Sequence, residues 1–284
     1  MSPVVDSRLV PAWPLTLAET VVDWPALDSH VIERRQKVEV AARPAARRVA
    51  VSTVEFGGVA PGATVELWSR LELGLAATVT FGYRSVGPEL RALRRRERVK
   101  ARLELPDAGA YGRAAVRGLE GAHEVVRRRA REAAAAIAEA ARRAAEAGLL
   151  ADEEEAARLA AVLSATARSL HNHVIELVGE ALNLGRTARV FEMSDPPVFA
   201  MRSEQLDKRT CEACSRLHGE ILEVGSSAYF SYLSPAGCFG GGRCRGIMVY
   251  ADGPAQVRGP ATRPGPQPSL PAIPPVHVPQ RRAA

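Results

Sequence analysis

The feature that most constrains the fold of this chain is a helical pattern that runs from about Arg113 to Leu184. Apolar residues recur there every three or four positions, a spacing that lines them along one face of an α-helix. Gly148 is typical of a helix end and Asp152 of a helix start, with a short link between them. The pattern therefore predicts two long helices that form an antiparallel hairpin. The apolar positions are Leu119, Ala122, Val126, Ala130, Ala133, Ile137, Ala140, Ala144 and Ala147, then Leu159, Leu163, Thr166, Leu170, Val174, Leu177, Ala181 and Leu184.

The composition agrees with a helix-rich chain. Alanine supplies much of the apolar content, and aromatic residues make up only 5% of the sequence. Such a mixture suits helix packing better than a thick sheet core. We therefore expect a mainly α fold with a small α+β lobe near the C-terminal end.

The segments before the hairpin are less regular. The β-branched run at 48–56 predicts a strand, whereas the run at 65–81 favours a helix. Residues 87–105 have the pattern of a short basic helix. After the hairpin, a second predicted strand occupies CRGIMVYA, residues 244–251. We expect four regions: a mixed N-terminal region at 1–110, the hairpin at 111–199, a cysteine-rich lobe at 200–252 and a disordered, proline-rich tail at 253–284.

All four cysteines of the chain lie in the predicted lobe. Cys211 and Cys214 form a CxxC turn, whose spacing lets two thiolates face one metal ion. Cys238 and Cys244 are separated by FGGGR, and the three glycines allow the tight path that would return both sulfurs to the same ion. Four thiolates would complete a tetrahedral structural zinc site with no open position for catalysis. His218 is a competing ligand.

Other interpretations of the cysteines remain open. No signal peptide is evident, so we expect a reducing cytoplasm, where clustered cysteines favour metal over disulfides. Two disulfides or four free thiols are the alternatives, and a thioredoxin-like redox pair is less well supported because no strand leads into CEAC. A bound zinc ion would stabilise a lobe of about fifty residues that has few large apolar side chains to bury.

The cysteine-rich lobe resembles a known family. LDKRTCEACSRLHG (206–219) and SPAGCFGGGRCRG (234–246) are similar to the C-terminal signature of tailed-phage minor head proteins, the phage Mu protein F-like or head morphogenesis family. The preceding SATARSLHNHVIELVGEALNLGRTARV resembles that family's helix, which ends in a GR turn. The resemblance covers roughly residues 160–250. The positions that match the family's motif are Asp207, Thr210, Cys211, Cys214, Leu217, Gly219 and Cys244.

Two positions depart from the family pattern. Gly241 stands where the family has a histidine, so Cys238 can act as the replacing ligand only if the glycine loop folds back. Gly246 stands where the last cysteine of a CRC ending is common, which removes one thiolate.

The resemblance implies a structural virion component and no enzymatic activity. It implies a minor capsid protein in the capsid interior, made in the host cytoplasm, that associates with the portal protein. Contact with a major capsid or scaffold protein, and non-specific contact with packaged DNA, would fit the same role. The formal charge of +6, carried almost entirely by arginine, permits such DNA contact.

Two other classes of function have some support in the sequence. A zinc-ribbon-like nucleic-acid binder is the main alternative, because Arg202, Lys208, Arg209, Arg216, Arg243 and Arg245 surround the cysteines. We expect Tyr229, Phe230, Tyr232 and Phe239 to form the lobe's core instead of stacking on bases. An enzyme is less well supported, since His171 and His173 lie two apart on a helix and face different directions, and the common catalytic motifs do not occur. No membrane-spanning segment is expected.

Overall fold

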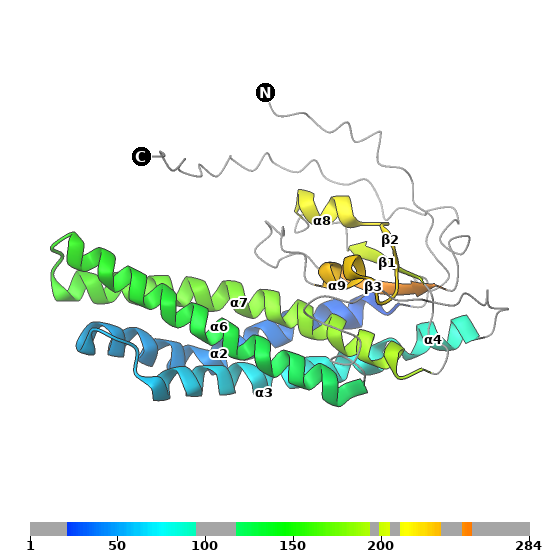
Figure 1. Cartoon of the computed structure of the whole chain (residues 1–284), viewed down its shortest axis with the longest axis horizontal. Coiled ribbons are helices and arrows are strands. Elements are labelled where there is room, and N and C mark those ends of the chain that lie inside the picture. The colour runs from blue at the N-terminus through cyan, green and yellow to red at the C-terminus, as the bar shows by residue number, and fades with distance from the viewer. Residues whose placement is uncertain (1–21, 95–117, 194–198, 205–210, 234–245, 252–284) are drawn as a thin grey trace, which may run out of the picture.

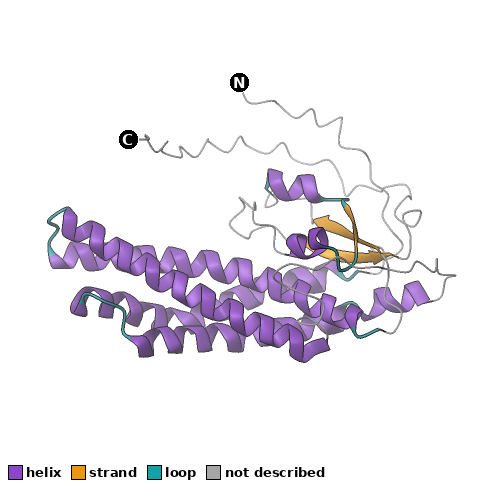
Figure 2. Cartoon of the chain, viewed as in Figure 1, coloured by secondary structure: helices purple, strands orange, loops and turns teal. Residues whose placement is uncertain are grey.

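A bundle of four long helices carries a small lobe at one end (Figure 1). The structure is a computed structural model that describes residues 22–94, 118–193, 199–204, 211–233 and 246–251. The bundle helices are α2 (Trp24–Phe56), α3 (Pro61–Ser85), α6 (Gly118–Leu150) and α7 (Glu155–Phe191). The predicted mainly helical fold with one small sheet is confirmed (Figure 2). Among the described helices, none combines the length and apolar character needed to span a lipid bilayer.

Neighbouring helices in the bundle run antiparallel, as their contacts show. Arg48 near the end of α2 pairs with Glu66 near the start of α3. Arg127 of α6 reaches back to Glu72 of α3, with 2.8 Å between its Nε and the carboxylate. The predicted hairpin of α6 and α7 is confirmed, and α2 and α3 join it around a shared core of leucine, valine and alanine. Alanines dominate on α6, and their small side chains let the neighbouring helices approach closely.

Two glycines bring α3 and α7 into close contact across the bundle. A Cβ added at Gly82 would lie 2.2 Å from the carbonyl oxygen of Leu182. A Cβ at Gly185 would lie 2.0 Å from the carbonyl oxygen of Val79. Only glycine permits backbones to approach this closely. Helices α3 and α7, which run parallel, therefore lie closer together than α2 and α6, the other diagonal pair of the bundle.

The predicted strand at 48–56 is wrong, because these residues form the last turns of α2. Val49 and Ala50 are fully buried against the other helices, and Thr53 is 2% exposed. Their i, i+1, i+4 spacing is that of one helix face, and packing in the bundle overrides the β-branched preference for a strand. The expected helix at 65–81 is confirmed within α3, and the start of the basic helix at 87–105 is confirmed as α4 (Gly87–Arg94). Residues 95–105 lie outside the described part.

Three predicted helix boundaries are also wrong. Helix α6 continues past Gly148 to Leu150. Asp152 has a φ of 53° in the link, and α7 starts at Glu155. Gly185 does not end α7, which continues to Phe191, because this glycine serves the close contact with α3.

The lobe is built on a three-stranded antiparallel sheet of order β2-β1-β3. Its strands are β1 (Phe199–Glu204), β2 (Ile221–Glu223) and β3 (Gly246–Ala251). The predicted strand at 244–251 is confirmed over 246–251 as β3, and residues 244–245 lie outside the described part. Ala200 of β1 lies opposite Leu222 on one side and Tyr250 on the other. Two short helices, α8 (Glu212–Leu217) and α9 (Ser227–Leu233), complete the lobe. The predicted proline-rich tail at 253–284 lies outside the described residues.

Candidate metal centre

Cys211 and Cys214 lie on the first turn of α8. Cys211 has an extended backbone, and its carbonyl accepts a hydrogen bond from the Ser215 amide at 2.8 Å, which starts the helix. Cys214 follows three residues later, so both side chains project from the same side of the turn. They are 5% and 1% exposed. This pair supplies two buried thiols from one turn, as half of a tetrahedral zinc site requires.

The second half of the predicted site lies outside the described residues. Cys238 and Cys244 both fall within 234–245. Within the described part of the chain, no group of three or more metal-ligating side chains occurs. The described half of the site therefore fits a thiolate-bound metal, and the complete set of four cysteines stays a prediction.

His218 closes α8 at its C-terminal end, with its amide 3.3 Å from the Ser215 carbonyl oxygen. Burial lowers the pKa of its imidazole below the usual value, so the ring is neutral near pH 7. A neutral ring can bind a metal. However, His218 does not form a three-ligand group with Cys211 and Cys214 among the described residues.

The turn after α8 is tied to the sheet through Gly219. Its φ of 86° is in the left-handed region, which favours glycine. The Gly219 amide donates to the Arg202 carbonyl at 2.8 Å, and the Arg202 amide donates to the Glu220 carbonyl at 2.9 Å. These bonds hold α8, and with it Cys211 and Cys214, beside strand β1.

Aromatic side chains fill the lobe, as the sequence predicts. Tyr229 and Phe230 are 0% and 3% exposed, and their rings meet edge to face with centroids 5.3 Å apart. Phe230 also meets Phe191 of α7 in a T-shaped contact at 5.9 Å. Tyr232 is partly buried, and Phe239 lies outside the described residues. The lobe and the bundle therefore share one continuous core.

A buried segment of α7 joins the lobe to the bundle. Every residue from Glu180 to Ala188 is buried, although four of the nine are polar or charged. Asn183 shows how the polar ones are satisfied: its amide nitrogen donates to the carbonyls of Leu233 and Gly246 at 3.2 and 3.1 Å. Its amide oxygen accepts from the Met248 amide at 3.3 Å. One side chain thus contacts both α9 and β3.

Arg186 connects three further elements. Its guanidinium is 0% exposed and forms an ion pair with Glu89 of α4, which is 1% exposed. Two of its nitrogens donate to the Met248 carbonyl of β3 at 3.0 and 3.3 Å. The third donates to the Ser85 hydroxyl, at the end of α3, at 3.1 Å. This buried arginine therefore joins α4 and the end of α3 to strand β3 of the lobe.

Thr187 extends this polar contact into the lobe's core. Its hydroxyl lies 2.7 Å from the Tyr229 hydroxyl, which lies 2.8 Å from the hydroxyl of Tyr250. Burial raises the pKa of both tyrosines, so each phenol stays protonated and can donate. The three hydroxyls form a chain from α7 through α9 to β3.

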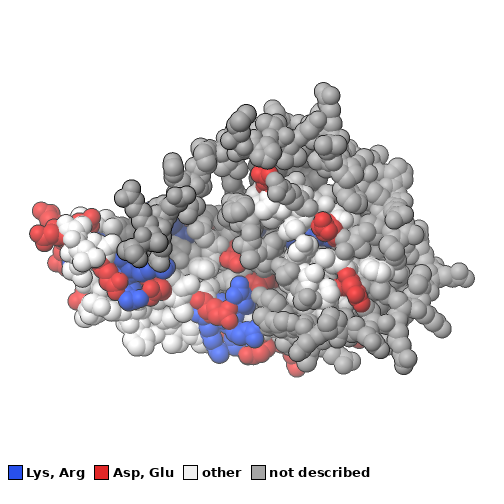
Figure 3. Space-filling view, turned by 45° about the horizontal axis from the view of Figure 1, so that its top comes forward, with Lys and Arg blue, Asp and Glu red and all other residues white. Residues whose placement is uncertain are grey.

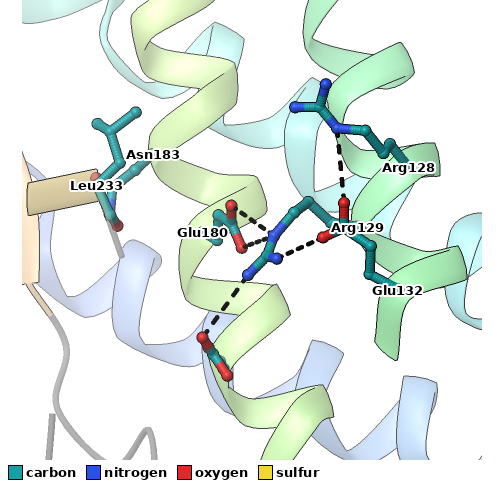
Figure 4. Close-up of polar contacts among 7 residues, drawn as sticks. Arg128, Arg129, Glu132, Glu180, Asn183 and Leu233 are labelled. Carbon is teal, nitrogen blue, oxygen red and sulfur yellow. Dashed lines mark hydrogen bonds and ion pairs between the residues drawn. The ribbon is translucent and has the colours of Figure 1, made fainter. Parts of the chain in front are cut away.

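Glu180, the first residue of the segment, pairs with α6 instead of the lobe (Figure 4). The Nε of Arg129 lies 3.1 Å from each carboxylate oxygen of Glu180, whose side chain is 1% exposed. Arg129 also pairs with Glu132 at 2.6 Å. One turn further along α7, the labelled Asn183 meets Leu233 of the lobe in the same view. The buried segment thus binds α6 at one end and the lobe at the other.

Sequence analysis did not find the buried polar residues of α7. The available signal was the presence of Asn183, Arg186 and Thr187 within an otherwise apolar run, ALNLGRTARV. The histidines of α7 match expectation. His171 is exposed and lies 2.9 Å from the Glu39 carboxylate of α2, and His173 is partly buried with a pKa lowered by that burial.

No family model matches the chain, and no significant match is found among curated proteins or solved structures.

Proposed function

We propose that this chain is a minor capsid, or head morphogenesis, protein of a tailed phage or prophage. The observation that carries the proposal is the motif that runs from Asp207 to Gly219 and returns at Cys244, which resembles the signature of that family. The role is structural: the chain would lie inside the head, associate with the portal protein and contact packaged DNA. A major capsid or scaffold protein is a second candidate partner.

The arrangement of α7 and the lobe supports this proposal. The resemblance involves two separate segments, the helix that contains NLGRT and the cysteine-rich lobe. Asn183, Arg186 and Thr187 of that helix bind the backbone and hydroxyl groups of the lobe. Because each segment needs the other to satisfy its buried polar groups, a family signature that includes both has a physical basis.

Zinc would act as a structural ion in this proposal. Cys211, Cys214, Cys238 and Cys244 would hold it, and the ion would add folding free energy to the lobe. The described residues contribute two buried thiols and a turn fixed by Gly219. The lobe would then be held rigidly on the bundle for contact with a partner.

Surface charge bears on the proposed contact with DNA. Blue and red side chains lie interspersed over the described surface in Figure 3. On the bundle, Arg142 illustrates the pattern because it pairs with Glu139 and Glu146, both at 2.7 Å. Arginines neutralised in this way bind phosphates weakly, so DNA contact is the secondary part of the proposal.

The alternative of a zinc-ribbon-like nucleic-acid binder has less support. It needs the arginines around the cysteines to face a ligand. Arg202 is 3% exposed, and its guanidinium donates to the Tyr232 carbonyl at 2.7 Å. This arginine therefore serves the lobe's packing.

The proposal is tested on phage particles. Particles are induced from the host that encodes the chain, purified with and without DNA, and examined by quantitative peptide mass spectrometry. We expect a few copies of the chain per head in both preparations, and co-purification with the portal protein when the two are co-expressed. Absence from purified particles, with normal amounts in the lysate, would contradict the proposal.

A further inference from the structure

A groove lies between α2 and α3, in the half of the bundle away from the lobe. It has a volume of about 630 Å³ and is open to solvent. Its lining combines small or apolar groups with four charged ones: Pro44, Arg47, Arg48, Val51, Ser52, Glu55, Ala60, Gly62, Ala63 and Glu66. Arg48 and Glu66 pair with each other across it. The other two charged residues, Arg47 and Glu55, do not form such a pair within the described part of the chain.

Arg47 and Glu55 are exposed and form no ion pair or hydrogen bond with any described residue. They lie eight residues apart on α2, which separates them by about 12 Å along the axis, too far to pair with each other. Val51 lies midway between them. Arg47, Val51 and Glu55 share one face of the helix, and Pro44 continues that face toward the N-terminus.

This face is complementary to itself. Suppose that a second copy of α2 packs antiparallel, with Val51 opposite Val51. Each residue before Val51 in one copy then lies opposite the residue that follows Val51 by the same number of positions in the other copy. Arg47 then faces Glu55 of the second copy, and Glu55 faces Arg47. Pro44 lies opposite the link after α2, where Gly57 and Gly58 have open space around them. A two-fold symmetric contact of this kind buries the same patch on both copies.

We propose that this groove is the interface of a symmetric homodimer, in which α2 packs antiparallel against α2 of a second copy with Val51 on the two-fold axis. The face from Pro44 to Glu55 covers about three turns of helix, or roughly 17 Å. This length gives an interface at the small end of the range for specific complexes. We therefore expect a weak, concentration-dependent dimer. This dimer is independent of the proposed role in the phage head.

Charge reversal tests the pairing directly. Arg47→Glu alone, or Glu55→Arg alone, places like charges opposite each other twice per dimer, and the dissociation constant should rise about tenfold or more. The double variant Arg47→Glu/Glu55→Arg restores opposite charges and should restore the dimer. Arg168→Glu makes the same charge change on an exposed face of α7, where this arginine donates a hydrogen bond to Ser164, and should leave dimerisation unchanged.

The measurement is sedimentation velocity of the full chain over a range of concentrations, at about 50 mM and about 500 mM salt, because screening weakens exposed ion pairs. Val51→Cys adds an independent readout: mild oxidation should give a linkage between position 51 of both copies, identified by peptide mass spectrometry. A monomer at every concentration overturns the proposal, and slow thiol labelling of Cys at 51 in that monomer would assign the groove to another segment of the same chain. The proposal is also overturned if the double variant has a dissociation constant no lower than those of the single variants.

Discussion

Replacing Arg186 by methionine should destabilise the whole protein, because this arginine compensates a buried charge. The guanidinium is inaccessible to solvent, and its partner Glu89 is 1% exposed. Methionine keeps much of the apolar volume but removes the guanidinium that forms an ion pair with the buried Glu89 carboxylate. It also removes the donors to the Met248 carbonyl and the Ser85 hydroxyl.

The expected cost follows from the burial of both partners. Breaking a buried ion pair by removing one member typically costs about 3–5 kcal/mol, because the remaining charge has no water to solvate it. The double variant Arg186→Met/Glu89→Leu removes both charges together. Since apolar replacement of a whole pair is often close to neutral, the double variant should lose about 1–2 kcal/mol, less than either single variant.

Urea unfolding followed by circular dichroism measures these free energies, with the slope of the transition checked for each variant. Hydrogen exchange adds a local readout. In Arg186→Met, amides of β3 should lose protection before those of the distal half of α6, because Met248 is the point of attachment. An Arg186→Met variant within about 1 kcal/mol of the parent would refute the reasoning, and so would a double variant as unstable as the two single losses added together.

Further substitutions test other contacts of the bundle and the lobe. Gly185→Ala and Gly82→Ala place a Cβ 2.0 and 2.2 Å from a backbone oxygen. Each should lower the free energy of unfolding by about 3 kcal/mol, measured by chemical unfolding, or prevent folding. Parent-like stability would contradict the close contact between α3 and α7. Gly179→Ala in open space on α7 should instead stabilise by about 0.5–1 kcal/mol. Tyr229→Phe interrupts the chain of three hydroxyls and should cost about 1 kcal/mol, and no loss in thermal unfolding would show that the chain contributes nothing. Burial lowers the pKa of His30 from 6.5 to about 4. The contribution of the neutral ring to stability is therefore complete above pH 6.5 and is lost as the pH falls toward 4. NMR titration of the ring checks the pKa, and His30→Gln should make the free energy of unfolding less dependent on pH between about 6.5 and about 4.

The hairpin of α6 and α7 could be predicted from sequence because its periodicity is long and regular. Residues 48–56 could not be assigned in the same way. Their β-branched side chains suit a strand locally, and only packing against three other helices makes them helical. Gly185 was misassigned for a related reason: a glycine that ends a helix and a glycine that admits a neighbouring backbone look the same in the sequence.

The candidate metal site could be predicted only in part. The CxxC spacing identifies Cys211 and Cys214, and the structure places both on one buried turn. The dependence of the lobe on Asn183 and Arg186 was not predictable. Their partners in the lobe include the backbone carbonyls of Gly246 and Met248, 63 and 62 positions away. Every residue has a backbone carbonyl, so the sequence does not indicate which of them accepts these hydrogen bonds.

Native mass spectrometry tests the central claim, a zinc-stapled lobe, most directly. The full chain is purified under reducing conditions without chelator, and its intact mass is compared before and after acidification. The account predicts one zinc ion per chain that is lost in acid, and no bound zinc in Cys211→Ser, whose lobe should become sensitive to protease while the bundle helices stay resistant. A chain that binds no metal, with the lobe equally protease-resistant in the parent and in Cys211→Ser, would contradict it.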